Sequence, residues 1–152
     1  MGMTVTISSD ALDFIRKSAA ALPDREVCGL LLGEGNSIVS AVPCTNVAAE
    51  PWHRFEIDPA ALIAAHRGAR GGGPAVIGHY HSHPTGLPEP SPRDAADAAP
   101  DGTIWLIAGG GEVTAWRAVA AGRRHGRFEP LALACADASV ASKRETSSRD
   151  FA

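Results

Sequence analysis

The spacing of the apolar positions, together with capping residues, predicts three helices. Between residues 10 and 22 the apolar side chains fall on one face at helical spacing, after a serine that can cap the first turn. Two further segments start with a capping residue followed by proline, which is favoured in the first helical turn. The predicted helices run over residues 10–22, over residues 59–69, and over a short segment that begins at Pro92.

Shorter apolar or alternating runs predict eight strands, several of which are joined by tight turns. The run from Val27 to Leu32 is apolar throughout, which is typical of a strand covered on both faces. Residues 54–57 alternate between polar and apolar types, as in a half-buried strand. The predicted strands cover residues 4–7, 26–33, 38–42, 54–57, 75–83, 103–108, 113–117 and 128–133.

The order of these elements indicates the fold class and the domain. Strand pairs joined by tight turns, with helices between them, favour a mixed sheet with helices packed on it, an α/β or α+β fold. A chain of 152 residues suits one domain, which we expect to span residues 1–136. From about Asp137 the sequence becomes polar and alanine-rich, so residues 137–152 are expected to form a disordered tail.

Composition and charge narrow the classes of function. The formal net charge of −3 gives no electrostatic reason to expect a nucleic acid or an acidic membrane as partner. The one basic cluster, residues 123–127, is interpreted as a solvated loop. Three widely spaced cysteines argue against a disulfide framework, and we expect a reducing cytoplasm as the compartment. Trp52 lies in an irregular segment and is a candidate contact for a partner.

Residues 81–94 concentrate side chains that bind metal ions. His81 and His83 are two positions apart on a predicted strand, so both imidazoles point to the same face and reach one ion. Asp94, on the short helix that follows a proline-rich loop, supplies a third ligand. Three protein ligands with one water are typical of a catalytic zinc site, although this N, N and O set also suits iron or manganese. We expect one zinc ion per chain, with water as its fourth ligand.

Three more residues are candidates for a role beside that ion. A water bound to zinc needs a base, and Glu26 is the leading candidate because an acid is unusual at the start of a core strand. The structural alternative is that Glu26 only ends the strand in solvent. Ser91 either caps the short helix or donates to a developing oxyanion, and the two roles are compatible. His79 shares the strand face and is a ligand candidate by alternation alone, or else a polar neighbour of the site.

These residues resemble a known family motif. Glu26, then His81-Ser82-His83-Pro84, then Ser91 and Asp94 are similar in type and spacing to the JAMM motif of MPN-domain (Mov34/PAD-1-like) metalloproteases. The resemblance covers about residues 4–133, and it implies a cytidine deaminase-like mixed sheet packed between helices. It further implies zinc on His81, His83 and Asp94, with Glu26 as general base and acid, Ser91 as stabiliser of the tetrahedral intermediate, and no ligand role for His79.

The resemblance also implies a class of substrate. Members of the family hydrolyse peptide or isopeptide bonds after the Gly-Gly tail of ubiquitin-like proteins, and this short chain resembles the stand-alone bacterial members. Those members are linked to small β-grasp sulfur-carrier proteins, from which they release cysteine or a short C-terminal extension. Two alternatives stay open: a non-catalytic MPN-like scaffold that binds zinc and such a partner, and a thiol hydrolase that uses Cys28.

Overall fold

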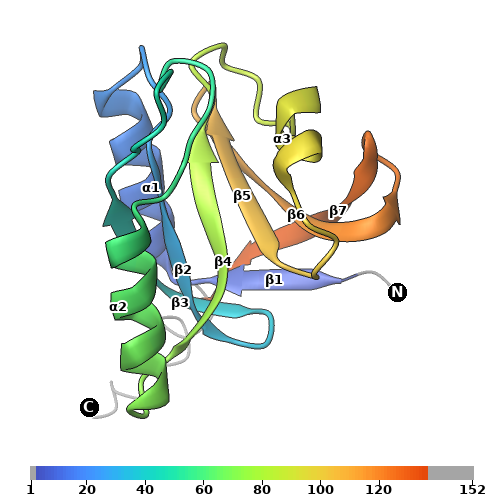
Figure 1. Cartoon of the computed structure of the whole chain (residues 1–152). Coiled ribbons are helices and arrows are strands. Elements are labelled where there is room, and N and C mark those ends of the chain that lie inside the picture. The colour runs from blue at the N-terminus through green and yellow to red at the C-terminus, as the bar shows by residue number, and fades with distance from the viewer. Residues whose placement is uncertain (1–2, 137–152) are drawn as a thin grey trace, which may run out of the picture.

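The protein is a mixed sheet that closes on itself, with three helices around it (Figure 1). The computed structural model describes residues 3–136, so the expected tail at 137–152 lies outside the described residues. The strands follow the order β1–β3–β2–β4–β5–β6–β7, and β1 closes the sheet because it pairs in parallel with both β3 and β7. The strands are β1 (Thr4–Ile7), β2 (Cys28–Glu34), β3 (Ser37–Cys44), β4 (Ala75–Ser82), β5 (Ile104–Gly109), β6 (Glu112–Gly122) and β7 (Gly126–Cys135). The helices are α1 (Ser9–Ala21), α2 (Pro59–Arg70) and α3 (Pro92–Asp97).

The helices begin where their capping residues predict. The Ser8 hydroxyl accepts a hydrogen bond from the backbone N–H of Ala11, and the Asp58 carboxylate accepts one from Ala60 at the start of α2. Each bond satisfies one of the amides that the first helical turn leaves without a partner. The mixed α+β class predicted from the order of the elements is confirmed.

Strand β5 separates two hydrophobic cores. Its even-numbered residues, such as Leu106, belong to the cluster that contains Ile15 of α1 and Tyr80 of β4. Its odd-numbered residues, Trp105 and Ile107, belong to a second cluster with Trp116 and Phe128. Because side chains alternate across a strand, β5 is buried on both faces and contributes one face to each core. The second core lies next to the histidines of β4, as the ring contact between His81 and Trp105 shows.

Strand β4 lies between β2 and β5, and this position places its histidines. It pairs antiparallel with β2, where Cys28 is opposite His81, and parallel with β5, where His81 is opposite Ile107. Close approach of the strands requires glycine at position 29, since a Cβ there would overlap the Tyr80 ring and the Val42 carbonyl oxygen. The pairing brings the residues just before β2 to the carboxyl end of β4, near which α3 also lies (Figure 1).

One predicted strand is wrong. Residues 54–57 form no strand, and only Ile57 makes an isolated bridge, to Asn46. The side chain of Asn46 takes the backbone groups that a neighbouring strand would need: its amide donates to the Arg54 carbonyl, and its oxygen accepts from the Glu56 N–H. The other seven predicted strands are present, although β6 and β7 extend further than predicted.

No helix within residues 3–136 combines the length and the apolar character that a membrane crossing requires.

The composition of the first core predicts which side chains can be shortened without loss of stability. Ile15→Ala should lower the free energy of unfolding by about 2–5 kcal/mol, because Ile15 is fully buried and the cavity left behind cannot close completely. Ile63→Ala is the matched control: Ile63 is 54% exposed on α2, and its loss should cost no more than about 0.5 kcal/mol. Urea unfolding of both variants measures the difference, and equal losses would contradict this assignment of the core.

Candidate metal centre

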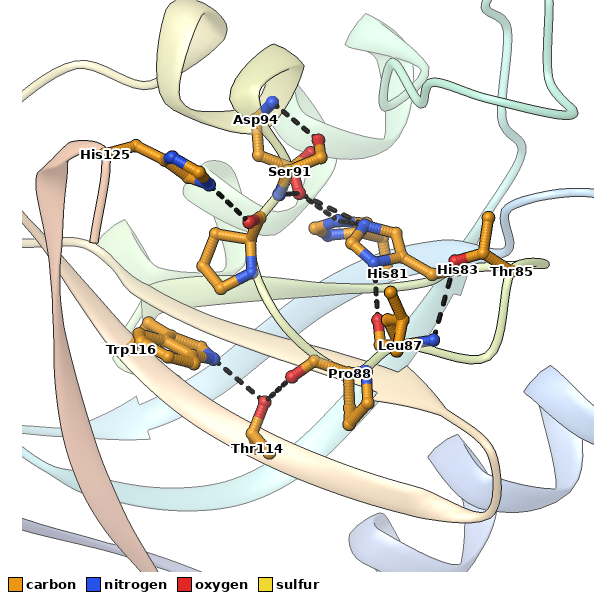
Figure 2. A network of polar contacts seen from close by, with 11 residues as sticks. His81, His83, Thr85, Leu87, Pro88, Ser91, Asp94, Thr114, Trp116 and His125 are labelled. Carbon is orange, nitrogen blue, oxygen red and sulfur yellow. Dashed lines mark hydrogen bonds and ion pairs between the residues drawn. The ribbon is translucent and has the colours of Figure 1, made fainter.

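Two imidazoles and a carboxylate converge at the carboxyl end of β4. The Nε2 atoms of His81 and His83 lie 3.1 Å apart, and the Asp94 Oδ2 atom lies 3.2 Å from the first and 3.1 Å from the second. His81 is fully buried and Asp94 is almost fully buried. The structure therefore brings together the three residues that the sequence singled out, from β4, the residue after it, and α3 (Figure 2).

The start of α3 fixes the position of Asp94. The Ser91 hydroxyl accepts a hydrogen bond from the Asp94 N–H at 3.0 Å, and the Asp94 Oδ2 accepts one from the Ser91 N–H at 2.9 Å. This reciprocal pair is a capping box, which satisfies two backbone amides of the first turn. The same Oδ2 atom faces both histidines, so the helix cap also sets the distance between Asp94 and the imidazoles.

A hydrogen bond to the backbone determines which ring nitrogen of His83 carries the proton. Its Nδ1 lies 2.8 Å from the Leu87 carbonyl oxygen, and a carbonyl only accepts, so Nδ1 carries the proton. In the neutral ring Nε2 then presents a lone pair to the cluster, whereas in the protonated ring Nε2 donates to the Asp94 Oδ2 atom at 3.1 Å. A metal-binding histidine is commonly oriented by such a bond from its other nitrogen to a backbone carbonyl.

The cluster has the chemistry and the dimensions of a cation site. Three lone-pair donors within 3.2 Å of one another repel unless a proton or a metal ion lies among them. In a tetrahedral zinc site with bonds of about 2.0–2.1 Å, neighbouring ligand atoms lie about 3.3 Å apart, close to these separations. In addition, His81 Nδ1 and Glu26 Oε1 are buried and have no hydrogen-bond partner within residues 3–136. The residues present fit a zinc ion.

Electrostatics within the cluster follow the same logic. Burial alone would raise the pKa of Asp94, but hydrogen bonds from His81 and His83 hold it well below its ordinary value. Burial likewise lowers the pKa of His81. For His83 burial acts in the same direction, yet the hydrogen bond and charge of Asp94 outweigh it and raise the pKa. Asp94 is therefore ionised and provides the fixed negative charge of the cluster.

Glu26 lies beside the histidines and is 5% exposed, so it does not end the strand in solvent. A carboxyl oxygen of Glu26 and one ring nitrogen from each of His81 and His83 lie within 4.8 Å of one another. Burial raises the pKa of this carboxyl to about 7, against the opposing charge of His83. Asp94 is nearer to the imidazoles and hydrogen-bonded to both, so we favour Asp94 as the third metal ligand and leave Glu26 free to exchange a proton.

The backbone around Glu26 is tied to β4 and to the following loop. The Val27 N–H donates to the Ser82 hydroxyl at 2.9 Å, and the Ser82 N–H donates to the Val27 carbonyl at 3.0 Å. The Glu26 N–H itself donates to the Pro51 carbonyl at 2.7 Å. These bonds connect the acid to the strand that carries the histidines, so their relative positions are fixed by backbone contacts.

Asn46 organises the backbone next to Glu26, a contact that sequence reasoning missed. Its Nδ2 donates to the Glu26 carbonyl at 2.9 Å and to the Arg54 carbonyl at 3.1 Å. Its Oδ1 accepts from the N–H groups of Ala48 at 3.0 Å and Glu56 at 3.1 Å. One amide thus holds Glu26 and both ends of the loop that follows β3. No local pattern distinguishes this asparagine from an ordinary loop residue.

Phe55 is a second missed residue, carried by the loop that Asn46 organises. Its ring stacks on His81 with centroids 4.3 Å apart and planes at 19°. It also contacts His79 and Trp105. The alternation of residues 54–57 suggested a strand, which hid the actual role of Phe55 as an apolar wall behind His81.

The loop between β4 and α3 is held at three of its carbonyl groups. Besides the bond from His83 to Leu87, the Thr114 hydroxyl donates to the Pro88 carbonyl and is itself held by Trp116 Nε1 at 2.8 Å (Figure 2). His125 Nε2 lies 3.0 Å from the Pro90 carbonyl oxygen and donates to it (Figure 2). These contacts keep the loop in one conformation beside the candidate metal ligands.

Residues 123–127 form a turn that is largely exposed to solvent, as predicted, but it also contacts the loop before α3. Arg124 pairs with Glu89 at 3.1 Å and lies over the Trp116 ring, 5.6 Å from its centroid. His125 is exposed and holds the Pro90 carbonyl. The pairing of β6 with β7 carries this turn to the loop before α3, a proximity that the local sequence does not indicate.

Several candidates lie outside the cluster. His79 packs against Trp105 with centroids 4.4 Å apart, and burial lowers its pKa to about 3, so its ring is neutral. His53 and His66 are exposed, as is Trp52, whose suggested contact with a partner stays a prediction. Burial raises the pKa of the Cys28 thiol to about 12, which leaves it protonated and removes the support for a thiol hydrolase.

Comparison with known proteins places this geometry in a family. The chain is 37% identical over 109 residues to the desampylase of Haloferax volcanii, across 68% of this chain and 78% of that protein. It is 30% identical over 97 residues to the probable TtuB-protein conjugate cleaving protease of Thermus thermophilus, across 64% of this chain and 65% of that protein. The fold is similar to that of a JAB1/MPN domain protein from Archaeoglobus fulgidus, with a TM-score of 0.55 at 19% identity over 86% of this chain and 99% of that one. The family described as prokaryotic homologs of the JAB domain (Prok-JAB) matches residues 8–119, and the chain belongs to it.

Proposed function

We propose that this protein is a zinc metallopeptidase that hydrolyses a peptide or isopeptide bond after the Gly-Gly C-terminus of a ubiquitin-like or sulfur-carrier protein. The observation that carries the proposal is the meeting of His81, His83 and Asp94 beside the buried carboxyl of Glu26, whose Oε1 atom has no hydrogen-bond partner among the described residues. The name of the Thermus relative, which refers to cleavage of a protein conjugate, supports a substrate of this kind. The desampylases of Haloferax volcanii and Pyrococcus furiosus are further relatives that support it.

Zinc would be held by the Nε2 atoms of His81 and His83 and by Oδ2 of Asp94. When bound, zinc polarises a carbonyl and lowers the pKa of a water molecule to about 7. The protein's contribution is to orient the three ligands: Leu87 holds His83, and the capping box with Ser91 holds Asp94. Such partners of the ligands keep the site arranged before substrate arrives.

Glu26 is the proposed general base and acid. Its carboxylate takes a proton from the attacking water as the new C–O bond forms at the scissile carbonyl carbon. The same carboxyl then donates that proton to the leaving nitrogen as the C–N bond breaks. A carboxyl whose pKa is raised to about 7 by burial both accepts and releases a proton near neutral pH.

Ser91 is the proposed donor to the oxyanion. Its oxygen already accepts the Asp94 N–H, and within the described residues its hydroxyl hydrogen has no acceptor. That hydrogen is therefore available to the carbonyl oxygen of the substrate, on which negative charge develops during attack. The capping role and the catalytic role use different parts of one hydroxyl group.

One prediction of this proposal concerns metal and substrate together. The protein incubated with a carrier that ends in Gly-Gly-Cys should release cysteine, seen as a loss of mass from the intact carrier. Phenanthroline should abolish the release and added zinc should restore it, because the Lewis acid is lost and regained. Zinc bound at one ion per chain without turnover on any Gly-Gly-extended carrier would favour the non-catalytic scaffold instead.

A histidine pair provides the control for metal binding. His81→Ala removes a buried ligand and should lower the zinc content to background, measured by atomic emission after dialysis. His66→Ala removes an exposed histidine of α2 and should leave the zinc content unchanged. Full zinc occupancy in His81→Ala would refute the ligand assignment.

A substitution of Glu26 separates the proposed base from the proposed metal ligands. Glu26→Gln keeps the shape of the side chain and should retain zinc, but kcat should fall about 10²–10⁴-fold because the proton acceptor is lost. Glu34→Gln, an exposed acid at the end of β2, should behave as wild type. If Glu26→Gln loses zinc while Asp94→Asn keeps it, Glu26 rather than Asp94 is the third ligand.

A further prediction concerns Asn46 as a positioning residue. Asn46→Ala should lower kcat about 10–100-fold with zinc content and KM little changed, because Glu26 loses the contact that sets its backbone. Asn36→Ala is the matched control. The Asn36 side chain accepts a hydrogen bond of 2.8 Å from Arg117, at a place remote from the metal centre. This control variant should lower thermal stability without changing kcat; equal kcat values for the two variants would show that Asn46 has only a structural role.

A further inference from the structure

A groove of about 300 Å³ lies directly beside the candidate metal centre. Its walls come from the C-terminal half of α1, the segment that precedes Glu26, the end of β4 with His83, and the turn between β5 and β6. A volume of this order is at the lower end of pockets that hold small ligands. The mechanism proposed above uses His83 but leaves the rest of this groove without a role.

The charged lining of the groove is mainly cationic. Two guanidinium groups, those of Arg16 and Arg25, line it together with His83, and Glu112 is the acidic residue among the lining groups. Both arginines are exposed, and within residues 3–136 neither has an ion-pair or side-chain hydrogen-bond partner. Arg25 immediately precedes Glu26 in the chain, so one of the two charges lies next to the candidate base. Unpaired guanidinium groups are well suited to bind a carboxylate through two parallel hydrogen bonds.

The other walls of the groove suit a slender ligand. Ala19 and Ala20 contribute small side chains, and glycines form the turn between β5 and β6. A Cβ at Gly110 would lie 2.9 Å from the Gly86 carbonyl oxygen, so the backbone of this turn packs closely against the loop after β4. The groove is therefore bounded by backbone and small residues on these sides, which leaves room for an extended peptide of few residues.

We propose that this groove binds the free α-carboxylate of a short C-terminal extension, with Arg16 and Arg25 as its ligands, and that it thereby selects the leaving group of the reaction. The proposal rests on the proposed function, and it names the substrate class within it. A released cysteine or short peptide carries a free carboxylate next to the scissile bond. A lysine that is joined by an isopeptide bond within a protein chain has its α-carboxyl in an amide, so it offers no such charge. Binding of this carboxylate therefore favours the trimming of carrier tails over the removal of whole conjugated proteins, within the peptide and isopeptide substrates proposed above.

The experiment compares two forms of one substrate. A carrier tail that ends in Gly-Gly-Cys with a free carboxylate should have a KM about tenfold lower than the same tail with a C-terminal amide. Arg16→Gln and Arg25→Gln should raise the KM of the carboxylate form toward that of the amide. Lys17→Gln, the adjacent cation on α1 that does not line the groove, should keep the wild-type preference. Glu112→Gln should enlarge the preference, since it removes the acidic group of the lining.

A binding measurement separates failure of this inference from failure of the proposed function. Calorimetric titration of the zinc-loaded Glu26→Gln variant with the two synthetic tails reports affinity without cleavage. Tighter binding of the carboxylate form, lost on adding Arg25→Gln, supports the groove even if no carrier is cleaved. Cleavage of both forms with equal KM and equal affinity overturns the groove and leaves the peptidase standing. Equal loss of affinity for both forms in the arginine variants would mean that the arginines bind the tail through a group other than its terminal carboxylate, and it would overturn the inference.

Discussion

Three electron-rich atoms meet at one end of the closed sheet, and the repulsion among them is the constraint on which the site depends. The Nε2 atoms of His81 and His83 and the Oδ2 atom of Asp94 lie 3.1–3.2 Å apart, and the other nitrogen of His83 is committed to Leu87. Such a group is stable only with protons or a cation among its members. The fold places nitrogen and oxygen atoms in the number and spacing that zinc accepts, which is the basis of the proposed metal site.

Hydrogen bonds to backbone groups help to hold this cluster in place. The cap of α3 fixes Asp94, a loop carbonyl fixes His83, and the amide of Asn46 fixes the segment that carries Glu26. Each contact satisfies a polar group that would otherwise be unpaired in a poorly hydrated region, so stability and arrangement of the site have the same origin. A loop that is held at Leu87 and Pro88 keeps its shape for the same reason.

Burial has opposite functional consequences for two neighbouring groups. It raises the pKa of the Glu26 carboxyl to about 7, where proton exchange at neutral pH is efficient. It raises the pKa of the Cys28 thiol to about 12, where the nucleophilic thiolate is absent. The same loss of hydration therefore brings the pKa of the Glu26 carboxyl close to neutral pH and keeps the thiol two residues later protonated. This difference favours hydrolysis through a metal and a carboxylate over covalent catalysis by cysteine.

Local patterns were sufficient for much of this protein. Helix caps, the apolar run of β2 and the alternation along β4 depend on neighbouring residues only, so the mixed class, the position of the histidines and the start of α3 could be predicted from them. Only the tertiary structure decided what depends on distant backbone groups. The side chain of Asn46 captured the amides of residues 54–56 and abolished a predicted strand, and the same contact carried Phe55 onto His81. The groove beside His83 likewise exists because α1 packs against the sheet next to the turn after β5, and no periodicity in the chain records that contact.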